Sequence, residues 1–151
     1  MNKLSWPRQQ RGVTLMELMV VLVIIAIIAS VAYPSYTQFV VRAKRAVATG
    51  ALLRIADRQQ QYFMDNKQFA ATLTSLGYAS DSIMVGENGG ILPTADDGRI
   101  YNIQISASNF VTYELTATPQ LYQAEKDTEC GNLTLTNTGE KGQSGSGDRC
   151  W

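Results

Sequence analysis

The chain has 151 residues, which is enough for one ordinary domain. Its 13 basic and 13 acidic side chains give a formal net charge of zero, and without residues 1–12 there are 10 basic residues against 13 acidic ones. That balance gives no bulk electrostatic reason to expect a nucleic-acid-binding protein. The chain has no histidine, the commonest general base and the commonest metal ligand. We therefore expect no enzyme, no metal site and no cofactor.

An apolar run follows the polar, basic start of the chain. Every residue from Leu18 to Ala32 except Ser30 is apolar, and the run extends back to Val13. About twenty such residues in a helix can cross the core of a bilayer. One charged side chain, Glu17, lies inside the run. The run predicts a membrane-spanning helix over residues 13–34.

Three interpretations of this beginning compete. In an ordinary secretory signal peptide, Ser30 and Ala32 would form the small-residue cleavage site, and the mature chain would start at Tyr33. In a plain membrane anchor, the basic residues would stay in the cytoplasm. In the third interpretation, the chain is cut before the apolar run, after Gly12, and the helix is kept in the product.

Residues 11–18, RGVTLMEL, favour the third interpretation. This stretch resembles the prepilin peptidase site of type IV pilins and of type II secretion pseudopilins. The resemblance implies a leader of residues 1–12, cleavage between Gly12 and Val13, and N-methylation of Val13. A glutamate is expected at the fifth residue of the mature chain, which is Glu17 here. Val13 departs from the family pattern, in which phenylalanine or methionine usually follows the cut.

The resemblance gives a role to Glu17 and to Pro34. A charge within an apolar helix is costly in lipid and is normally paired. In pilins the partner is the N-terminal amine of a neighbouring subunit, so Glu17 is expected to set the register of assembly. The alternative is a side chain that reaches the headgroups. Pro34 removes a backbone donor and predicts a kink or local melting of the helix. The alternative is a helix end after Ala32 and a new start at Ser35.

An amphipathic continuation of the helix is predicted from Ser35 to about Asp65. A stripe of mostly apolar residues recurs at spacings of three, four and seven positions: Val41, Ala48, Leu52, Ile55, Gln59 and Tyr62. Such a stripe must pack on something, and a following sheet is the natural candidate. Arg42, Lys44 and Arg45 form a basic cluster, which we interpret as a solvated face or as partners of acids on a neighbouring subunit. Contact with anionic lipid or DNA is the alternative.

Strand patterns follow the helix. Leu73–Leu76 predicts a short helical turn that Gly77 caps, and residues 86–98 predict a polar, Gly-rich loop. Alternating runs predict three strands at residues 99–106, 110–118 and 132–137. Residues 107–109 would join the first two as a hairpin, and Pro119 would end the second. We expect an α+β fold over residues 35–151, with the long N-terminal helix, half apolar and half amphipathic, packed on a small antiparallel sheet.

Cys130 and Cys150 lie near the C-terminus. An even count in a small exported chain suggests a disulfide, and two free thiols are the alternative. The bridge would be worth about 3 kcal/mol in the chain-entropy picture. Residues 130–136 (CGNLTLT) and 138–142 (TGEKG), with the final Cys-Trp, resemble the minor pilin called PilE of the type IVa system. The resemblance implies an exposed, disulfide-bounded loop that contacts neighbours or surfaces.

The function that the resemblance implies is that of a structural subunit of a type IV pilus, a minor pilin that contributes to pilus assembly and pilus-dependent motility. The subunit would wait in the bacterial inner membrane with its globular part in the periplasm, and would then enter an extracellular pilus. Its partners would be the membrane, other major and minor pilins, the prepilin peptidase and the inner-membrane assembly platform. A major pilin, a pseudopilin, or an adhesive or DNA-binding pilin that uses Arg149 and Trp151 are the alternatives.

Overall fold

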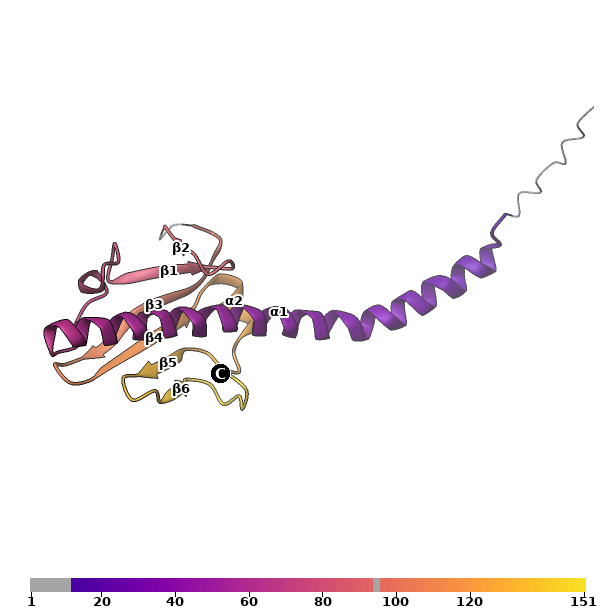
Figure 1. Ribbon diagram of the computed structural model, residues 1–151. Coiled ribbons are helices and arrows are strands. Elements are labelled where there is room, and N and C mark those ends of the chain that lie inside the picture. Colours follow the sequence, from indigo (N-terminus) through magenta and orange to yellow (C-terminus); the bar gives the residue numbers. More distant parts are fainter. Residues whose placement is uncertain (1–11, 94–95) are drawn as a thin grey trace, which may run out of the picture. The chain divides into compact units, whose positions relative to one another are not determined.

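The computed structural model describes residues 12–93 and 96–151. The chain divides into two compact units, one ending at Gln38 and one running from Phe39 to Trp151. The first helix, α1 (Leu15–Asn66), has 52 residues and belongs to both units (Figure 1). Two short helices follow it, the 3-10 helix η1 (Thr74–Leu76) and α2 (Leu121–Lys126).

Side chains define both ends of α1. At the start, the Thr14 hydroxyl accepts a hydrogen bond from the backbone amide of Glu17 at 3.2 Å, as an N-cap residue does. At the end, Lys67 has a φ of 59°, the left-handed conformation that terminates many helices. The Lys67 amide bonds back to the Phe63 carbonyl, and its ammonium group donates to the Met64 carbonyl.

The helix is continuous through Pro34. The interpretation with a helix end after Ala32 and a new start at Ser35 is therefore wrong for this structure, and melting within a filament stays a prediction. Side-chain hydroxyls donate to backbone carbonyls around this point: Ser30 to Ile27 (2.7 Å), Ser35 to Val31 (3.2 Å) and Thr37 to Pro34 (2.9 Å). Such bonds occupy carbonyls in a stretch where proline supplies no amide proton.

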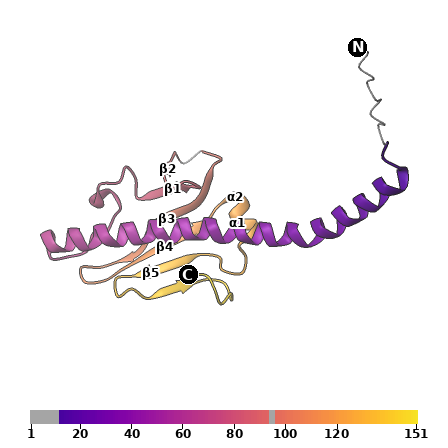
Figure 2. The ribbon, with the colours of Figure 1, turned by 45° about the vertical axis from the view of Figure 1, so that its right-hand side comes forward.

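The second unit contains one antiparallel sheet. Its strands are β1 (Ser82–Gly86), β2 (Ile91–Leu92), β3 (Arg99–Ser108), β4 (Tyr113–Pro119), β5 (Leu133–Thr136) and β6 (Lys141–Gln143). Their order across the sheet is β2-β1-β3-β4-β5-β6. Figure 2 shows the second half of α1 lying across one face of this sheet. The expected α+β fold is confirmed.

The three strands predicted from alternation are β3, β4 and β5, but β4 begins later than expected. Asn109 explains the difference. Its side-chain oxygen accepts hydrogen bonds from the backbone amides of Val111 (2.9 Å) and Thr112 (2.8 Å), and these bonds close a turn. Phe110 and Val111 therefore lie in the hairpin loop with exposed side chains. The predicted hairpin between these strands is confirmed, but its loop spans residues 109–112 instead of 107–109, and the predicted strand start at Phe110 is wrong.

Several short elements were not predicted. The Gly-rich loop expected at residues 86–98 contains β2, and β1 precedes it. β6 begins at Lys141, directly after the turn at residues 137–140, and α2 begins shortly after Pro119. β2 has two residues and β6 has three, which is too short for a period of two to be recognised. The turn at η1 and its left-handed cap at Gly77, with a φ of 85°, are confirmed.

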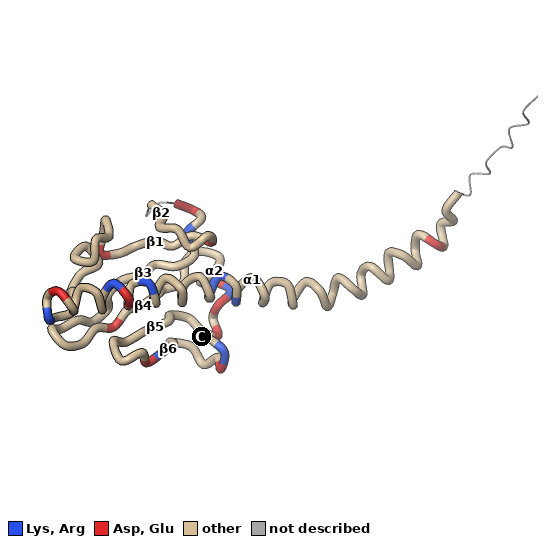
Figure 3. The backbone as a smooth tube through the Cα atoms, in the orientation of Figure 1, with Lys and Arg blue, Asp and Glu red and all other residues tan. Residues whose placement is uncertain are grey.

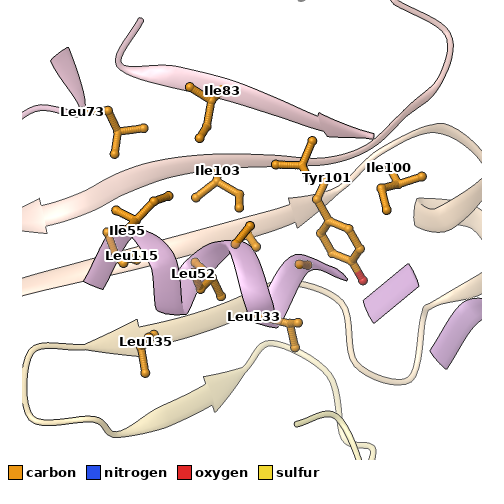
Figure 4. Packing of buried hydrophobic residues seen from close by; sticks show 14 of the residues in the cluster. Leu52, Ile55, Leu73, Ile83, Ile100, Tyr101, Ile103, Leu115, Leu133 and Leu135 are labelled. Carbon is orange, nitrogen blue, oxygen red and sulfur yellow. The ribbon is translucent and has the colours of Figure 1, made fainter. Parts of the chain in front are cut away.

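The core lies between α1 and the sheet, and Figure 4 shows its side chains from both layers meeting. Leu52 and Ile55 of α1 are fully buried against sheet residues that include Tyr101, Ile103 and Leu115. Most of the predicted helix stripe is buried, and Tyr62 is half-buried. Gln59, the polar member of that stripe, is buried because its amide group donates to the Ala70 carbonyl (2.9 Å) and accepts from the Ala70 amide (2.8 Å).

Candidate functional site

The predicted cleavage position lies just before α1. Gly12 and Val13 are exposed and belong to no helix or strand. A Cβ atom at Gly12 would meet no atom within 4 Å, so the described packing does not require glycine there. An exposed, non-helical peptide bond is the conformation that a processing enzyme can bind.

Glu17 lies in the first turn of α1 and is exposed. It is the one charged residue between Gly12 and Arg42, as the charge colouring of Figure 3 shows for the described residues. Thr14 and Glu17 have the Thr-x-x-Glu spacing of a capping box, a signal that the sequence interpretation overlooked. An acid in the first turn is also favoured by the helix dipole. Glu17 therefore has a local role at the helix start besides the predicted one.

The first half of α1 exposes apolar side chains on all sides of the helix in the single chain. The large ones from Val13 to Phe39 are Val13, Leu15, Met16, Leu18, Met19, Val20, Val21, Leu22, Val23, Ile24, Ile25, Ile27, Ile28, Val31, Tyr33, Tyr36 and Phe39. Among the described helices, α1 is long and apolar enough to cross a membrane by length and composition. A helix that is apolar all round is stable when lipid or other helices cover it.

The second unit contains a buried ion pair between α1 and the residue after α2. The guanidinium group of Arg45 donates from Nε to Asp127 Oδ2 (3.1 Å) and from Nη2 to Asp127 Oδ1 (2.5 Å). The two side chains are 9% and 0% exposed. Asp127 Oδ2 also accepts hydrogen bonds from the Tyr101 hydroxyl (2.9 Å) and from Gln123 Nε2 (3.0 Å). Four hydrogen bonds thus surround one buried carboxylate, which is the arrangement that a buried charge requires.

The electrostatics follow from this burial. Desolvation lowers the pKa of Arg45, but the hydrogen bond and the charge of Asp127 outweigh it, and the pKa is raised overall. Burial, with the nearby negative charge of Asp127, raises the pKa of Tyr101 well above its usual value of about 10. At neutral pH Arg45 is therefore charged and Tyr101 is neutral.

The interpretation of the basic cluster on α1 needs a correction. Arg45 is neither solvated nor available to a neighbouring subunit, because it is buried against Asp127 of its own chain. Its spacing of four from Val41 and three from Ala48 places it in the apolar stripe, so this signal was present in the sequence. Lys44 pairs with Glu87 at 2.7 Å, and Arg42 is exposed.

The predicted disulfide is present between Cys130 and Cys150, twenty positions apart, and both cysteines are buried. The chain inside it is tightly packed, because a Cβ atom at Gly145 would collide with the Glu129 carbonyl. The amides of Gly145 and Gly147 bond to the carbonyls of Cys130 (3.0 Å) and Glu129 (2.8 Å).

Residues 145–151, here called the C-terminal tail, carry Arg149 and Trp151, and β6 carries Lys141; the exposed acids Asp148 and Glu140 are the chain neighbours of these two cations. The Trp151 indole donates to the Gly142 carbonyl (2.8 Å), and the Lys141 ammonium group lies 5.4 Å from its ring centroid. Arg149, two residues before Trp151, is exposed. We call Lys141, Arg149 and Trp151 the tail patch. Cations beside an aromatic face are the groups that contact the phosphates and bases of a nucleic-acid strand.

Among the described residues, no group of three or more His, Cys, Asp or Glu side chains could hold a metal ion. The predicted leader at residues 1–11 lies outside the described residues, and the predictions at Gly12, Val13, Glu17 and Pro34 concern the first unit alone.

Comparison with known proteins gave two family matches. The model of the family described as type IV minor pilin ComP, DNA uptake sequence receptor, matches residues 34–134, more than half of the chain. The model of the prokaryotic N-terminal methylation motif matches residues 7–33. No curated protein matches the chain. Among solved structures, a type IV pilin from Shewanella oneidensis is similar at 17% sequence identity, over 71% of this chain and 92% of that one, with a TM-score of 0.43, too low to carry an argument.

Proposed function

Because the chain belongs to the family of type IV minor pilins whose model it matches, we propose that its N-terminal helix first holds it in a membrane and then polymerises it into a pilus. The observation that carries this proposal is the exposed apolar half of α1, most of which lies within the methylation motif matched at residues 7–33. In a membrane, lipid would cover that surface. In a filament, the helices of neighbouring subunits would cover it.

Processing would come first. The prepilin peptidase would remove residues 1–12 and methylate Val13, since the peptide bond after Gly12 is exposed and precedes the helix. Residues 13–34 would then span the inner membrane. The basic leader would stay on the cytoplasmic side, which places the second unit in the periplasm. The subunit would join other pilins at the inner-membrane assembly platform and contribute to pilus-dependent motility, with a structural and not an enzymatic role.

Glu17 would supply the charge that aligns one subunit with the next. Cleavage before Val13 creates a positive α-amino group, and in an apolar environment a carboxylate is stable when such a cation pairs with it. The pairing would be strong because no water screens it. The register of assembly would follow from the position of Glu17 along the helix.

The mass and N-terminal sequence of the protein from native membranes test the processing step. We expect a chain that begins at N-methylated Val13. A chain that begins at Tyr33 would overturn the proposal, because the apolar helix would then be a discarded signal peptide. An uncut chain in cells that contain the prepilin peptidase would leave a plain membrane anchor and would also overturn it.

A matched pair of variants tests the assembly role of Glu17. Glu17→Gln removes the charge but keeps a side chain that suits a capping box, whereas Thr14→Ala removes the N-cap and keeps the charge. We expect Glu17→Gln to reduce the amount of this subunit in sheared filaments at least about tenfold, with membrane levels unchanged. Equal losses for the two variants would mean that Glu17 acts only at the helix start.

Capture of DNA is a second candidate function, favoured by the description of the matching family as a DNA uptake sequence receptor and by the tail patch. The net charge does not attract DNA, so binding would depend on local cations. We expect the full chain in detergent to bind duplex DNA. Lys141→Gln and Arg149→Gln should each reduce the slope of the logarithm of the binding constant against the logarithm of salt concentration by about one. The control is Lys67→Gln, at an exposed lysine after the end of α1.

A further inference from the structure

We propose that Arg45 is the positioning residue of the C-terminal tail: its buried guanidinium group holds the tail in one orientation on α1, and this orientation lets the tail patch engage a phosphodiester strand. The second half of this inference rests on the proposed capture of DNA. The first half concerns the order of the tail and stands without it.

Arg45 contacts the chain on both sides of the disulfide-bounded loop. Before Cys130, it holds the carboxylate of Asp127, whose own carbonyl accepts the amide of Gly131 at 2.9 Å. Before Cys150, its Nη1 donates to the carbonyl of Arg149 at 2.8 Å. One side chain on α1 therefore donates hydrogen bonds near both ends of the loop that the disulfide closes.

Cys150 and Trp151 pack at the apolar core, but the tail's own hydrogen bonds do not reach α1. The amides of Gly145 and Gly147 bond to residues 129–130, which themselves belong to the base of the loop. The Trp151 indole bonds to Gly142, also inside the loop. These contacts shape the loop, whereas the bond from Arg45 to the Arg149 carbonyl ties its last residues to the helix. Arg149 of the tail patch is thus held through its backbone while its side chain stays exposed.

The chemistry of the guanidinium group suits this task. Its donors form a rigid planar fork, so two of them can serve a carboxylate while a third serves a carbonyl in another direction. A lysine at the same position could pair with Asp127 from a single nitrogen atom but would not hold both partners in fixed directions. Because a buried ion pair often contributes little net stability compared with an apolar pair, its specific geometry is the property that distinguishes it here.

The experiment compares wild-type full-length protein in detergent with Arg45→Lys and with the matched control Arg42→Lys, the same change at an exposed residue of the same helix. Hydrogen exchange is measured at the indole N–H of Trp151, whose bond to the Gly142 carbonyl requires the last residues to stay in place, and at core amides of β3 and β4. In Arg45→Lys we expect tail exchange to be faster by about tenfold or more, as when a hydrogen bond to a charged group is lost, with the core unchanged.

Two exchange results would overturn the inference. If the tail exchanges alike in Arg45→Lys and Arg42→Lys, Arg45 does not order it. If the core exchanges faster together with the tail, Arg45 acts through the stability of the whole unit. Should Arg45→Lys fail to fold, it is combined with Asp127→Glu, whose longer side chain restores reach to the shorter ammonium group without restoring the bond to the Arg149 carbonyl.

Binding to duplex DNA gives the second readout. We expect Arg45→Lys to weaken binding about tenfold with an unchanged salt slope, because a buried residue that touches no phosphate releases no counterions. Unchanged affinity with a disordered tail would overturn the recognition half of the inference. Failure of the wild-type protein to bind DNA would overturn the proposed capture and that half with it, and hydrogen exchange would still decide whether Arg45 positions the tail.

Discussion

At the scale of single residues, Asp127 carries the most concentrated set of interactions in the second unit. It lies after α2 and accepts hydrogen bonds from Arg45, Tyr101 and Gln123, which belong to three different elements. Gln123 Nε2 also donates to the Val41 carbonyl at 3.2 Å. The first turns of α1 in the second unit are therefore joined to α2 through polar groups, beside an otherwise apolar core.

Removal of that carboxylate should strongly destabilise the folded second unit. Asp127→Ala leaves the Arg45 charge buried without its partner, and we expect a loss of about 3–5 kcal/mol in the free energy of unfolding. Urea unfolding followed by circular dichroism measures it. Lys44→Ala is the control, because Lys44 pairs with an exposed acid, Glu87, and should cost about 1 kcal/mol or less. Equal losses would contradict the burial of the Arg45–Asp127 pair.

Tyr101 makes stability depend on pH in the alkaline range. Its pKa in the folded chain is raised above the usual value near 10, so its contribution is fully present below about pH 10 and is lost as pH rises through the folded pKa. Above pH 10 the wild-type free energy of unfolding should fall by up to about 1.4 kcal/mol per pH unit more steeply than that of Tyr101→Phe. Urea titrations from pH 8 to 11 test this, with the exposed Tyr33→Phe as control. Parallel curves for wild type and Tyr101→Phe would contradict it.

At the scale of elements, the two halves of α1 are stabilised differently. The first half is apolar on every side, and its large side chains are exposed. The second half buries one stripe against the sheet, and Leu52 and Leu53 show the contrast between neighbours. Leu52 is fully buried in the core, whereas Leu53 is 53% exposed.

This contrast gives a direct prediction for the second half of α1. Leu52→Ala should lower the free energy of unfolding by about 2–5 kcal/mol, because it removes buried atoms and leaves a cavity. Leu53→Ala should stay within about 0.5 kcal/mol of wild type, as exposed substitutions do. Urea unfolding of both variants measures the difference. Similar losses would mean that the helix packs on the sheet with another face.

The strand boundaries were decided by contacts that no alternating pattern contains. Phe110 and Val111 continue the pattern of β4, yet the side chain of Asn109 closes a turn there and the strand starts at Tyr113. β1 pairs with both β2 and β3, so its existence depends on partners that lie elsewhere in the chain. Prediction succeeded for strands with a clear alternation, such as β3 and β5, and failed for β1, β2 and β6.

At the scale of the whole molecule, the disulfide between Cys130 and Cys150 closes the end of the second unit. The chain inside the loop includes β5 and β6 but offers few buried apolar side chains besides Leu133 and Leu135. The crosslink therefore restricts a segment that a small core stabilises weakly. It acts mainly by reducing the conformational entropy of the unfolded chain.

Replacement of both cysteines by serine should lower the free energy of unfolding by about 3 kcal/mol, the value for a loop of this length. The urea midpoint of wild type, with and without reductant, should shift by the same amount as in the double variant. The variant under reductant is the control and should not shift further. No shift in reduced wild type would mean that the loop is held without the bond.

The sequence by itself determined the apolar N-terminal helix and the fold class. A methylation motif, an apolar run with one acid, and repeats of 3.6 and two residues are local patterns, and the forces that they report act between near neighbours along the chain. Only the tertiary structure decided the role of Arg45. Its partners Asp127 and Arg149 lie 82 and 104 positions away. No pattern near Arg45 indicates which distant carboxylate or carbonyl will be buried beside it, because that choice is made when helix, sheet and tail pack together.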